Sequence, residues 1–260
     1  MTTESMSSPL QGKKGIVLGI ANDQSLAWGC AKAFSAQGAE LALSYFNDRA
    51  KPYVAPLAEA VNAPIFLPLD VTDQAQWDQF FAQVKDEWGR IDFALHSIAF
   101  APKDDLHGRV VDCSREGFLQ AMDVSCHSFI RMARACEPLM PDGGSLLTMS
   151  YYGAQRVVEN YNLMGPVKSA LEASVREMAT ELGEHRIRVN ALSAGPIKTR
   201  AASGLSDFDK LMEKAAATAP LHQLTTIDDV GAMAAFLVSD LARHITGQTL
   251  FVDCGYNIVG

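Results

Sequence analysis

Short apolar runs alternate along this chain with longer segments whose apolar side chains recur at helical spacing. The runs lie at 14–20, 41–46, 64–69, 91–96, 145–150, 188–192 and 249–252. Continuous apolar runs of this length, bounded by turn-forming residues, are typical of strands that are buried in a parallel sheet. The pattern therefore predicts seven strands.

The segments between these runs predict helices. Apolar side chains repeat every three to four residues in 26–37, 73–88, 118–140, 161–183 and 226–239. Asp73 and Thr226 are suited to the N-cap positions of two of these helices, and Gly89 is suited to end the first of them. Strands that alternate with helices of ten or more residues predict an α/β fold, a doubly wound parallel sheet with helices on both faces.

Length and composition favour one domain. The chain has 260 residues, of which 48% are hydrophobic and 20% charged, so it can bury a large core. The first eleven residues are polar and rich in Ser and Thr. We expect a flexible tail over 1–11 and a single domain over 12–260.

Charge and cysteine usage exclude several classes of function. A net charge of −8 without clusters of Lys and Arg argues against binding to nucleic acid. Five cysteines without C-x-x-C spacing indicate reduced thiols and no metal site. The chain has no apolar signal segment and no run of about 18 apolar residues. We expect a cytoplasmic protein that does not associate with the membrane.

In a sheet of this kind, ligands bind beyond the carboxyl ends of the strands. The turn from Gly19 to Ser25 leads from the first strand into a helix, an arrangement that presents backbone N–H groups to a pyrophosphate. The usual G-x-G-x-x-G is absent, and Gly19 and Ser25 could equally be a turn residue and a helix cap. Asp48 beside Arg49, at the end of the second strand, favours NAD over NADP. Asp70 could contact an adenine or cap a helix.

Further candidates follow the fourth, fifth and sixth strands. His96 is expected to be a core histidine, because no partner with catalytic spacing lies nearby in sequence. The turn 193–199 ends at Thr199, which could bind a cofactor or simply complete a Gly-Pro turn. Residues 201–217 form an amphipathic segment, either a flap over an apolar ligand or ordinary core, and 195–217 is the predicted substrate-binding flap.

Tyr161 and Lys168 are the candidates for chemistry. On a regular helix they would share a face about 10 Å apart, although Pro166 indicates that the helix could begin after Tyr161. A phenol with a pKa near 10 keeps its proton at neutral pH and can donate to a developing oxyanion. A nearby cation should lower that pKa. The spacing alone is more often an amphipathic face with an extended lysine.

From Leu10 to Asn257 the chain resembles the short-chain dehydrogenase/reductase superfamily, with its Rossmann-type sheet. Within it, the chain closely resembles the bacterial NADH-dependent enoyl-acyl-carrier-protein reductases, which place the catalytic pair as Tyr-x6-Lys. The other matching segments are Gly19-x5-Ser25, Tyr45-x-Asn47-Asp48, Asp70-Val71, His96-Ser97-Ile98-x-Phe100-Ala101-Pro102, Ser150-Tyr151, Asn160-Tyr161-Asn162-x-Met164-Gly165, Ser193-Ala194-Gly195-Pro196-Ile197 and Ala201-Ala202-Ser203-Gly204.

The resemblance implies a role for each matching residue. Tyr161 would donate to the substrate thioester carbonyl, Lys168 would hold the nicotinamide ribose, and Tyr151 would line the acyl site; these three are the implied catalytic residues. NADH would be bound by Gly19, Ile20, Ser25, Leu26, Asp70, Val71, Ser97, Ile98, Lys168, Ile197 and Thr199. The acyl substrate would be bound by Phe100, Ala101, Leu106, Tyr151, Tyr161, Met164, Ala201, Leu205 and Phe208.

The resemblance also implies the reaction and the partners. The expected activity is reduction of the C2=C3 double bond of trans-2-enoyl thioesters on acyl carrier protein, in the last step of fatty-acid elongation, by a homotetramer. Lys198, Arg200 and Lys210 are candidates to meet the acidic carrier. Phe46 departs from the Gln of many relatives and leaves the preference for NADH open. The alternatives are a reductase of 3-oxoacyl thioesters or free enones, and a cofactor-binding regulator without chemistry.

Overall fold

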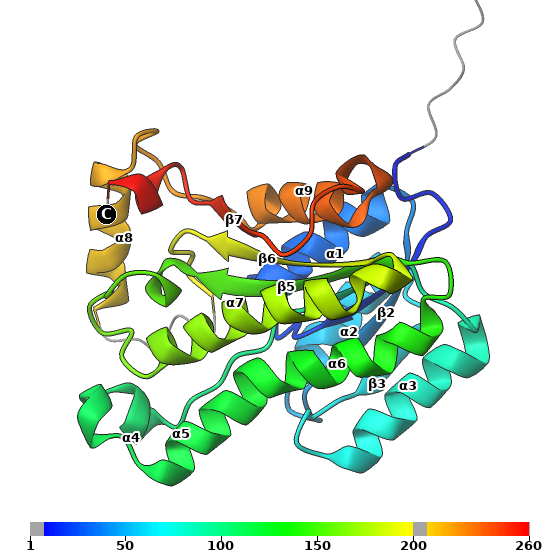
Figure 1. Ribbon diagram of the computed structural model, residues 1–260, viewed down its shortest axis with the longest axis horizontal. Coiled ribbons are helices and arrows are strands. Elements are labelled where there is room, and N and C mark those ends of the chain that lie inside the picture. The colour runs from blue at the N-terminus through cyan, green and yellow to red at the C-terminus, as the bar shows by residue number, and fades with distance from the viewer. Residues whose placement is uncertain (1–7, 200–206, 260) are drawn as a thin grey trace, which may run out of the picture.

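A parallel sheet of seven strands forms the centre of the computed structural model, which describes residues 8–199 and 207–259 (Figure 1). All six neighbouring strand pairs are parallel. The predicted doubly wound sheet is confirmed. The strands are β1 (Lys14–Leu18), β2 (Glu40–Tyr45), β3 (Ile65–Pro68), β4 (Phe93–His96), β5 (Gly144–Tyr151), β6 (Ile187–Ala194) and β7 (Thr249–Val252).

The order of the strands is β3-β2-β1-β4-β5-β6-β7, so the winding direction reverses between β1 and β4. Val17 of β1 lies beside Leu43 of β2 on one side and Leu95 of β4 on the other. Turns that leave β1 and β4 must therefore diverge to opposite faces of the sheet at their carboxyl ends, which is where ligands bind in this type of fold.

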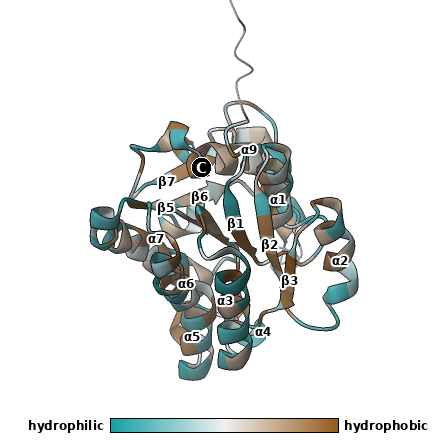
Figure 2. Ribbon diagram, turned by 90° about the vertical axis from the view of Figure 1, so that its right-hand side faces the viewer, coloured by the Kyte–Doolittle hydropathy of each residue, from teal (hydrophilic) through white to brown (hydrophobic). Residues whose placement is uncertain are grey.

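Helices cover both faces of the sheet (Figures 1 and 2). One buried cluster joins the sheet to α3, α6 and α7, and includes Phe80, Phe129 and Leu171; a second joins it to α1, α2 and α9, and includes Phe34 and Val54. The helices are α1 (Leu26–Ala36), α2 (Lys51–Ala60), α3 (Gln74–Trp88), α4 (Lys103–Leu106), α5 (Arg115–Met122), α6 (Ser128–Cys136), α7 (Met164–Glu181), α8 (Phe208–Thr218) and α9 (Ile227–Val238).

The predicted caps are present in the structure. The side chain of Asp73 accepts hydrogen bonds from the N–H groups of Ala75 and Gln76. Gly89 ends α3 in the left-handed conformation with φ of 65°, and Thr226 forms a reciprocal capping box with Asp229. These local signals fixed the helix ends correctly because each satisfies backbone groups that the helix leaves unpaired.

Two predicted helix starts were wrong. The helix predicted from residue 118 begins at Arg115 and passes through a π-helical turn, Asp123–His127, between α5 and α6. The helix predicted from residue 161 begins at Met164. Within the predicted tail, Leu10 is fully buried and its N–H donates to the Gln37 carbonyl.

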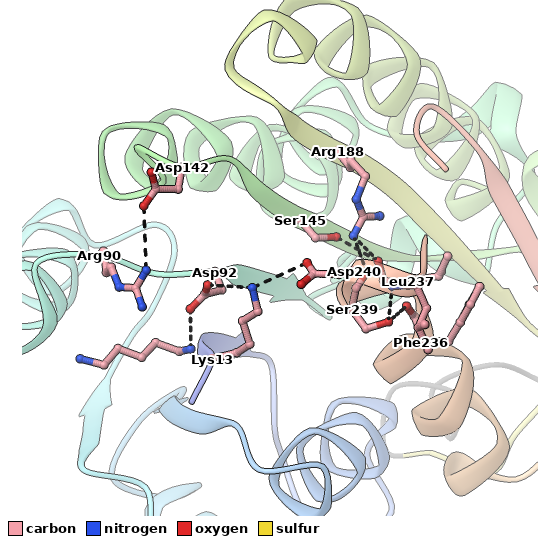
Figure 3. Close-up of polar contacts among 12 residues, drawn as sticks. Lys13, Arg90, Asp92, Asp142, Ser145, Arg188, Phe236, Leu237, Ser239 and Asp240 are labelled. Carbon is pink, nitrogen blue, oxygen red and sulfur yellow. Dashed lines mark hydrogen bonds and ion pairs between the residues drawn. The ribbon is translucent and has the colours of Figure 1, made fainter. Parts of the chain in front are cut away.

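The amino-terminal edge of the sheet is held by a polar network (Figure 3). Lys13 forms ion pairs with Asp92 and with Asp240, at 3.3 and 3.6 Å. Arg188 of β6 donates to the carbonyl oxygens of Leu237 and Ser239 at the end of α9. The network satisfies carbonyls at a helix C-terminus, so this edge has a structural role, whereas the opposite edge carries the candidate residues.

Candidate active site

The turn after β1 is closed by contacts that suit a cofactor-binding loop. Gly19 has a φ of 103°, and a Cβ placed there would lie 2.1 Å from the carbonyl oxygen of Ser97. Only glycine therefore fits between the ends of β1 and β4. The Ser25 hydroxyl accepts from the N–H groups of Ala21 and Asn22 and does not cap α1. Ser25 thus holds the turn that leads into α1.

The carboxyl ends of the strands bring the other predicted cofactor residues to the same edge. Ile98 lies against Gly19, whereas Ile20 and Ile197 pack into the cluster around α1 and α9. The Asp70 carboxylate accepts from the N–H and hydroxyl of Thr72, so it closes a turn, and Asp73 is the helix cap instead.

The ends of three further segments complete the predicted cofactor set. Leu26 is the first residue of α1, which has no acidic residue in its first turn. Val71 is buried, and its carbonyl accepts from the Arg131 guanidinium at 2.6 Å. The Thr199 N–H donates to the carbonyl of Ile197.

The segment after β4 is fixed by the π-helical turn. Ser125, which is fully buried, accepts from the N–H of Phe100 at 2.8 Å and donates to the Phe100 carbonyl at 3.0 Å. The Phe100 side chain is 46% exposed. Sequence reasoning did not single out Ser125, since nothing in the letters shows that the helix turns irregular there.

Tyr161 lies in a turn and not on a helix. The residues on either side of it, Asn160 and Asn162, adopt positive φ angles of 62° and 43°. Asn tolerates this conformation better than most residues. The Asn162 amide also donates to the carbonyl of Leu106 at 2.8 Å, which ties the turn to α4. The helical geometry considered for Tyr161 and Lys168 does not apply, because regular helix begins only at Met164.

An apolar cluster surrounds the Tyr161 ring. The rings of Tyr151 and Tyr161 lie 4.7 Å apart at 59°. A Cβ on Gly153 would come within 2.3 Å of the Tyr161 ring, so the segment after β5 packs directly on it. Of the predicted substrate-binding residues, the cluster contains Ala101, Leu106, Tyr151, Tyr161 and Met164.

The predicted flap is only partly described. Phe208 begins α8, and Ala215 of the same helix packs with Tyr152 and Tyr256. Ala201 and Leu205, predicted to bind substrate, and Arg200, a predicted carrier contact, lie outside the described residues.

Lys168 is a buried cation. Its side chain is 5% exposed, and Nζ donates to the Met149 carbonyl at 2.6 Å. Burial lowers the pKa of Lys168 to about 8, and the nearby Cys126 and Glu172 oppose this shift. The amine is therefore charged below about pH 8 and close to titration in the physiological range.

His96 is the core histidine that the sequence predicted. Both ring nitrogens have hydroxyl partners, Thr148 at 3.2 Å and Ser128 at 2.7 Å. Burial, followed by the charge of Lys168, lowers the pKa of His96 to about 3. The imidazole is neutral at physiological pH and serves as a structural hydrogen-bonding group.

The two phenols remain protonated. Burial is the main cause that raises the pKa of Tyr161 well above its ordinary value, and Tyr151 and Glu172 raise it further. Burial likewise raises the pKa of Tyr151. The expectation that the pKa of Tyr161 would be lowered was wrong, because loss of solvation raises it. A protonated phenol is a hydrogen-bond donor.

A buried carboxylate stands one helical turn after Lys168. Glu172 is 5% exposed, and it accepts from the Ser150 hydroxyl at 2.6 Å and the Gln155 amide at 3.1 Å. Sequence reasoning missed this residue. Its signal was available, since an acidic residue beside Leu171 breaks the apolar stripe of α7 at the i+4 position from Lys168.

Two buried hydroxyl oxygens at this edge lack protein partners within the described part of the chain: those of Tyr151 and Ser193. Buried polar groups are normally satisfied, so a bound ligand is a natural partner for them. Among the described residues, no group of three or more His, Cys, Asp and Glu side chains could hold a metal ion. The arrangement offers hydrogen-bond donors and one cation within an apolar setting.

Comparison with known proteins identifies the family. The family model described as enoyl-(acyl carrier protein) reductase matches residues 19–257. The chain belongs to the enoyl-acyl-carrier-protein reductase family. Among curated relatives, the enoyl-[acyl-carrier-protein] reductase [NADH] FabI of Rickettsia typhi is 48% identical over 96% of both chains. That of Bacillus cereus is 46% identical over 96% of this chain and 99% of its own.

Solved structures of enoyl-acyl-carrier-protein reductases share the whole fold. The Anaplasma phagocytophilum reductase in complex with NAD is 51% identical, with a TM-score of 0.93 over 98% of this chain and 97% of that one. The Bacillus cereus reductase with NADP+ and indole naphthyridinone is 45% identical, with a TM-score of 0.94 over 97% of this chain and 99% of that one. The predicted family, fold and enzyme class are confirmed.

Proposed function

We propose that this chain reduces the C2=C3 double bond of trans-2-enoyl thioesters on acyl carrier protein, with NADH, in the last step of fatty-acid elongation. Membership of the enoyl-acyl-carrier-protein reductase family supports the reaction class. The observation that carries the site assignment is the buried, protonated Tyr161 packed against Tyr151, with the Lys168 ammonium on the adjoining helix.

The described residues fit a nicotinamide dinucleotide. Because Gly19 has no side chain, the backbone after β1 can lie against the backbone of Ser97 after β4, where the winding direction of the sheet reverses. The N-terminus of α1 carries no acidic residue, so its positive end is open to a pyrophosphate. Phe46 is 56% exposed at the end of β2 and offers a ring face, without a hydrogen bond, to an adenosine. Lys168 would hold the nicotinamide ribose hydroxyls.

The chemistry assigned to Tyr161 is that of an oxyanion donor. When bound, reduced nicotinamide would supply a hydride to C3 of the enoyl thioester. As negative charge moved to the carbonyl oxygen, the Tyr161 hydroxyl would donate a hydrogen bond to it and stabilise the enolate, which would then take a proton from solvent at C2. A preorganised donor in a water-poor site stabilises the developing charge much more than a donor in water does, because the donor does not have to reorient during the reaction. Apolar neighbours such as Leu106 and Met164 exclude water.

Replacing Tyr161 with Phe tests this role, because only the hydroxyl is lost. We expect kcat with a crotonyl thioester to fall by about 100- to 1000-fold, with NADH affinity and melting temperature unchanged. NADH oxidation followed by absorbance gives the rate. Tyr53→Phe is the matched control, since Tyr53 is 63% exposed on α2. Full activity in the Tyr161→Phe enzyme would refute the assignment.

The same assay separates the alternatives. Turnover of a 3-oxoacyl thioester alone would identify a reductase of the sibling class. NADH binding without turnover of either thioester would identify a regulator. Repeating the assay with NADPH measures the cofactor preference that Phe46 leaves open.

The proposed partner is acyl carrier protein, which would present its substrate near α8. Lys198 and Lys210 are exposed there, but each pairs with an acidic neighbour, Asp209 at 2.9 Å and Asp207 at 2.7 Å. An acidic carrier would have to compete with these exposed pairs, which are individually weak. We therefore propose that, when the carrier docks, Lys198 and Lys210 leave Asp209 and Asp207 and pair with carboxylates of the carrier.

We also propose that the enzyme is a cytoplasmic homotetramer. No helix among the described residues is long and apolar enough to cross a membrane. Apolar side chains are exposed on α5 and α6, namely Phe118, Leu119 and Ile130. Others are exposed on α9 and the segments that follow it, namely Phe236, Leu241, Ile258 and Val259. Exposed apolar faces of this kind support self-association.

A further inference from the structure

Glu172 has a position that a structural carboxylate rarely takes. It is almost completely buried, yet its two oxygens accept from neutral donors, Ser150 and Gln155, and form no ion pair within 4.0 Å with a described basic residue. Removing a carboxylate from water costs several kcal/mol unless the surroundings compensate it. Compensation must come from charge at longer range and from these two hydrogen bonds.

The two partners of Glu172 bracket Tyr151. Ser150 precedes Tyr151 at the end of β5, and Gln155 follows the short helix that comes next. Glu172 therefore attaches both ends of the segment 150–155 to α7. This is the segment that carries the Tyr151 ring and places Gly153 against the Tyr161 ring. Its position determines where both phenols lie.

Glu172 also acts on Lys168, because it raises the pKa of the lysine, after the larger effect of Cys126. The titratable groups that influence the lysine, or that it influences, are Cys126 on the π-helical turn, His96 on β4 and Glu172 on α7. Burial raises the pKa of the Cys126 thiol, so it is neutral. His96 is neutral as well, with a pKa of about 3. Of these three groups, Glu172 is the one carboxyl, and it lies one helical turn after Lys168 on α7.

We propose that Glu172 is a positioning residue for the reaction: it fixes segment 150–155, on which Tyr161 rests, and its negative charge keeps Lys168 protonated for cofactor binding. The second part rests on the proposed function, because it takes Lys168 to hold the nicotinamide ribose. The two parts have different signatures, since geometry affects kcat and charge affects the pH range of NADH binding.

Glu172→Gln tests the charge. The amide oxygen can still accept from Ser150, and the Gln155 side chain can turn to offer its oxygen to the new amide, so the hydrogen bonds survive. Without the anion, Lys168 loses its proton at lower pH. We expect the alkaline midpoint of NADH binding, near pH 8 in the parent enzyme by the pKa of Lys168, to move down by about one pH unit. Affinity at pH 6 should be unchanged.

Glu172→Ala and Ser150→Ala test the geometry. Glu172→Ala removes both hydrogen bonds, and we expect kcat to fall by about 10- to 100-fold at the optimum pH, as misplacement of a catalytic group by about 1 Å does. Glu172→Gln should restore most of that loss. Ser150→Ala keeps the charge, so it should lower kcat without moving the NADH midpoint. If Glu172→Ala does not fold, the other two variants still decide both parts.

NADH fluorescence measured between pH 6 and 10 gives the midpoints, and a stopped assay with a crotonyl thioester gives kcat. Glu177→Gln is the matched control, because it removes an exposed negative charge from the same helix. Lys168→Met distinguishes a failure of the proposed role of Lys168 from a failure of the inference about Glu172. If it binds NADH with the parent's pH profile, the proposed role of Lys168 fails. If it abolishes the titration while Glu172→Gln titrates like the parent, the charge part of the inference fails; equal kcat in all Glu172 variants overturns the geometric part.

Discussion

At the scale of the residue, Lys168 shows how burial sets a working pH. The free side chain has an ordinary pKa of 10.5, which burial lowers to about 8 in the folded protein. Below pH 8 both the folded and the unfolded chain bind this proton, and the cost of burying the charge is fully present. Above pH 8 only the unfolded chain still binds it, until its own pKa is passed.

This difference predicts how the stability of the cofactor-free enzyme depends on pH. The contribution of Lys168 to the free energy of unfolding should rise between pH 8 and 10.5, by about 3 kcal/mol across the window. As the pH rises from 7 to 10, the free energy of unfolding of the parent should therefore increase relative to that of Lys168→Met. Urea unfolding at pH 7, 8, 9 and 10 measures it. Lys214→Met, at an exposed position on α8, should show no such trend.

Residue-level chemistry was the part of the site that sequence could only partly predict. Tyr161 and Lys168 were identified from their resemblance to a known spacing, and their burial confirms that they are not an exposed amphipathic face. The direction of the Tyr161 pKa was wrong, because it depends on how completely the fold removes water from the ring. Glu172 breaks the apolar stripe of α7, which is visible in the sequence, but its two hydrogen-bond partners lie some 20 residues earlier in the chain and could not be predicted.

At the scale of the element, the sequence predicted strands better than helix ends. Continuous apolar runs identify buried strands because both faces of the sheet are covered. Helix α2 was not predicted, and it contains Pro52 and Pro56. Pro52 lies in the first turn, where a missing N–H costs nothing, and the helix tolerates Pro56 because Val54 and Ala58 pack into the core.

The crossing of α1 and α9 is an element-level feature with a testable cost. A Cβ on Gly29 would lie 2.1 Å from the Ile227 carbonyl oxygen, and one on Gly231 would lie 2.3 Å from the Gly29 carbonyl oxygen. We expect Gly29→Ala to destabilise the protein by about 1–3 kcal/mol, because the backbones of α1 and α9 must move apart. It should also weaken NADH binding, since α1 begins at the proposed pyrophosphate site.

Thermal unfolding and NADH titration check this prediction. Gly183→Ala is the control, because nothing lies within 4 Å of the added methyl group and its φ is not positive. The melting temperature of that variant should be unchanged or slightly higher, because alanine leaves the unfolded chain fewer conformations than glycine does. Equal melting temperatures for Gly29→Ala and Gly183→Ala would show that α1 and α9 can separate without cost.

At the scale of the whole molecule, topology explains why scattered residues form one site. Parallel strands end at the same edge, so segments after β1, β3, β4, β5 and β6 meet although more than 100 residues separate the first from the last. The sequence predicted this meeting from the alternation of strands and helices. It could not predict the order of the strands, which depends on packing across the whole sheet.

Two sets of exposed apolar side chains lie on different parts of the molecule. One set lies on α5 and α6 and the other around α9 and the C-terminal segment, and Figure 2 shows α9 near the top of the view and α5 at the bottom. A tetramer with twofold axes needs two different self-complementary faces. The proposed homotetramer would use one set at each interface.

Charged substitutions can separate the two interfaces. We expect Leu119→Lys combined with Ile130→Lys to disrupt only the α5–α6 face and to leave dimers, because burying lysine without a partner is costly. Leu241→Lys combined with Phe236→Lys should leave dimers of the other kind, and the two pairs together should give monomers. Light scattering after size exclusion measures the mass of each. Tyr53→Lys, at an exposed position on α2, should remain a tetramer, and a tetramer that survived both pairs would show that neither face mediates association.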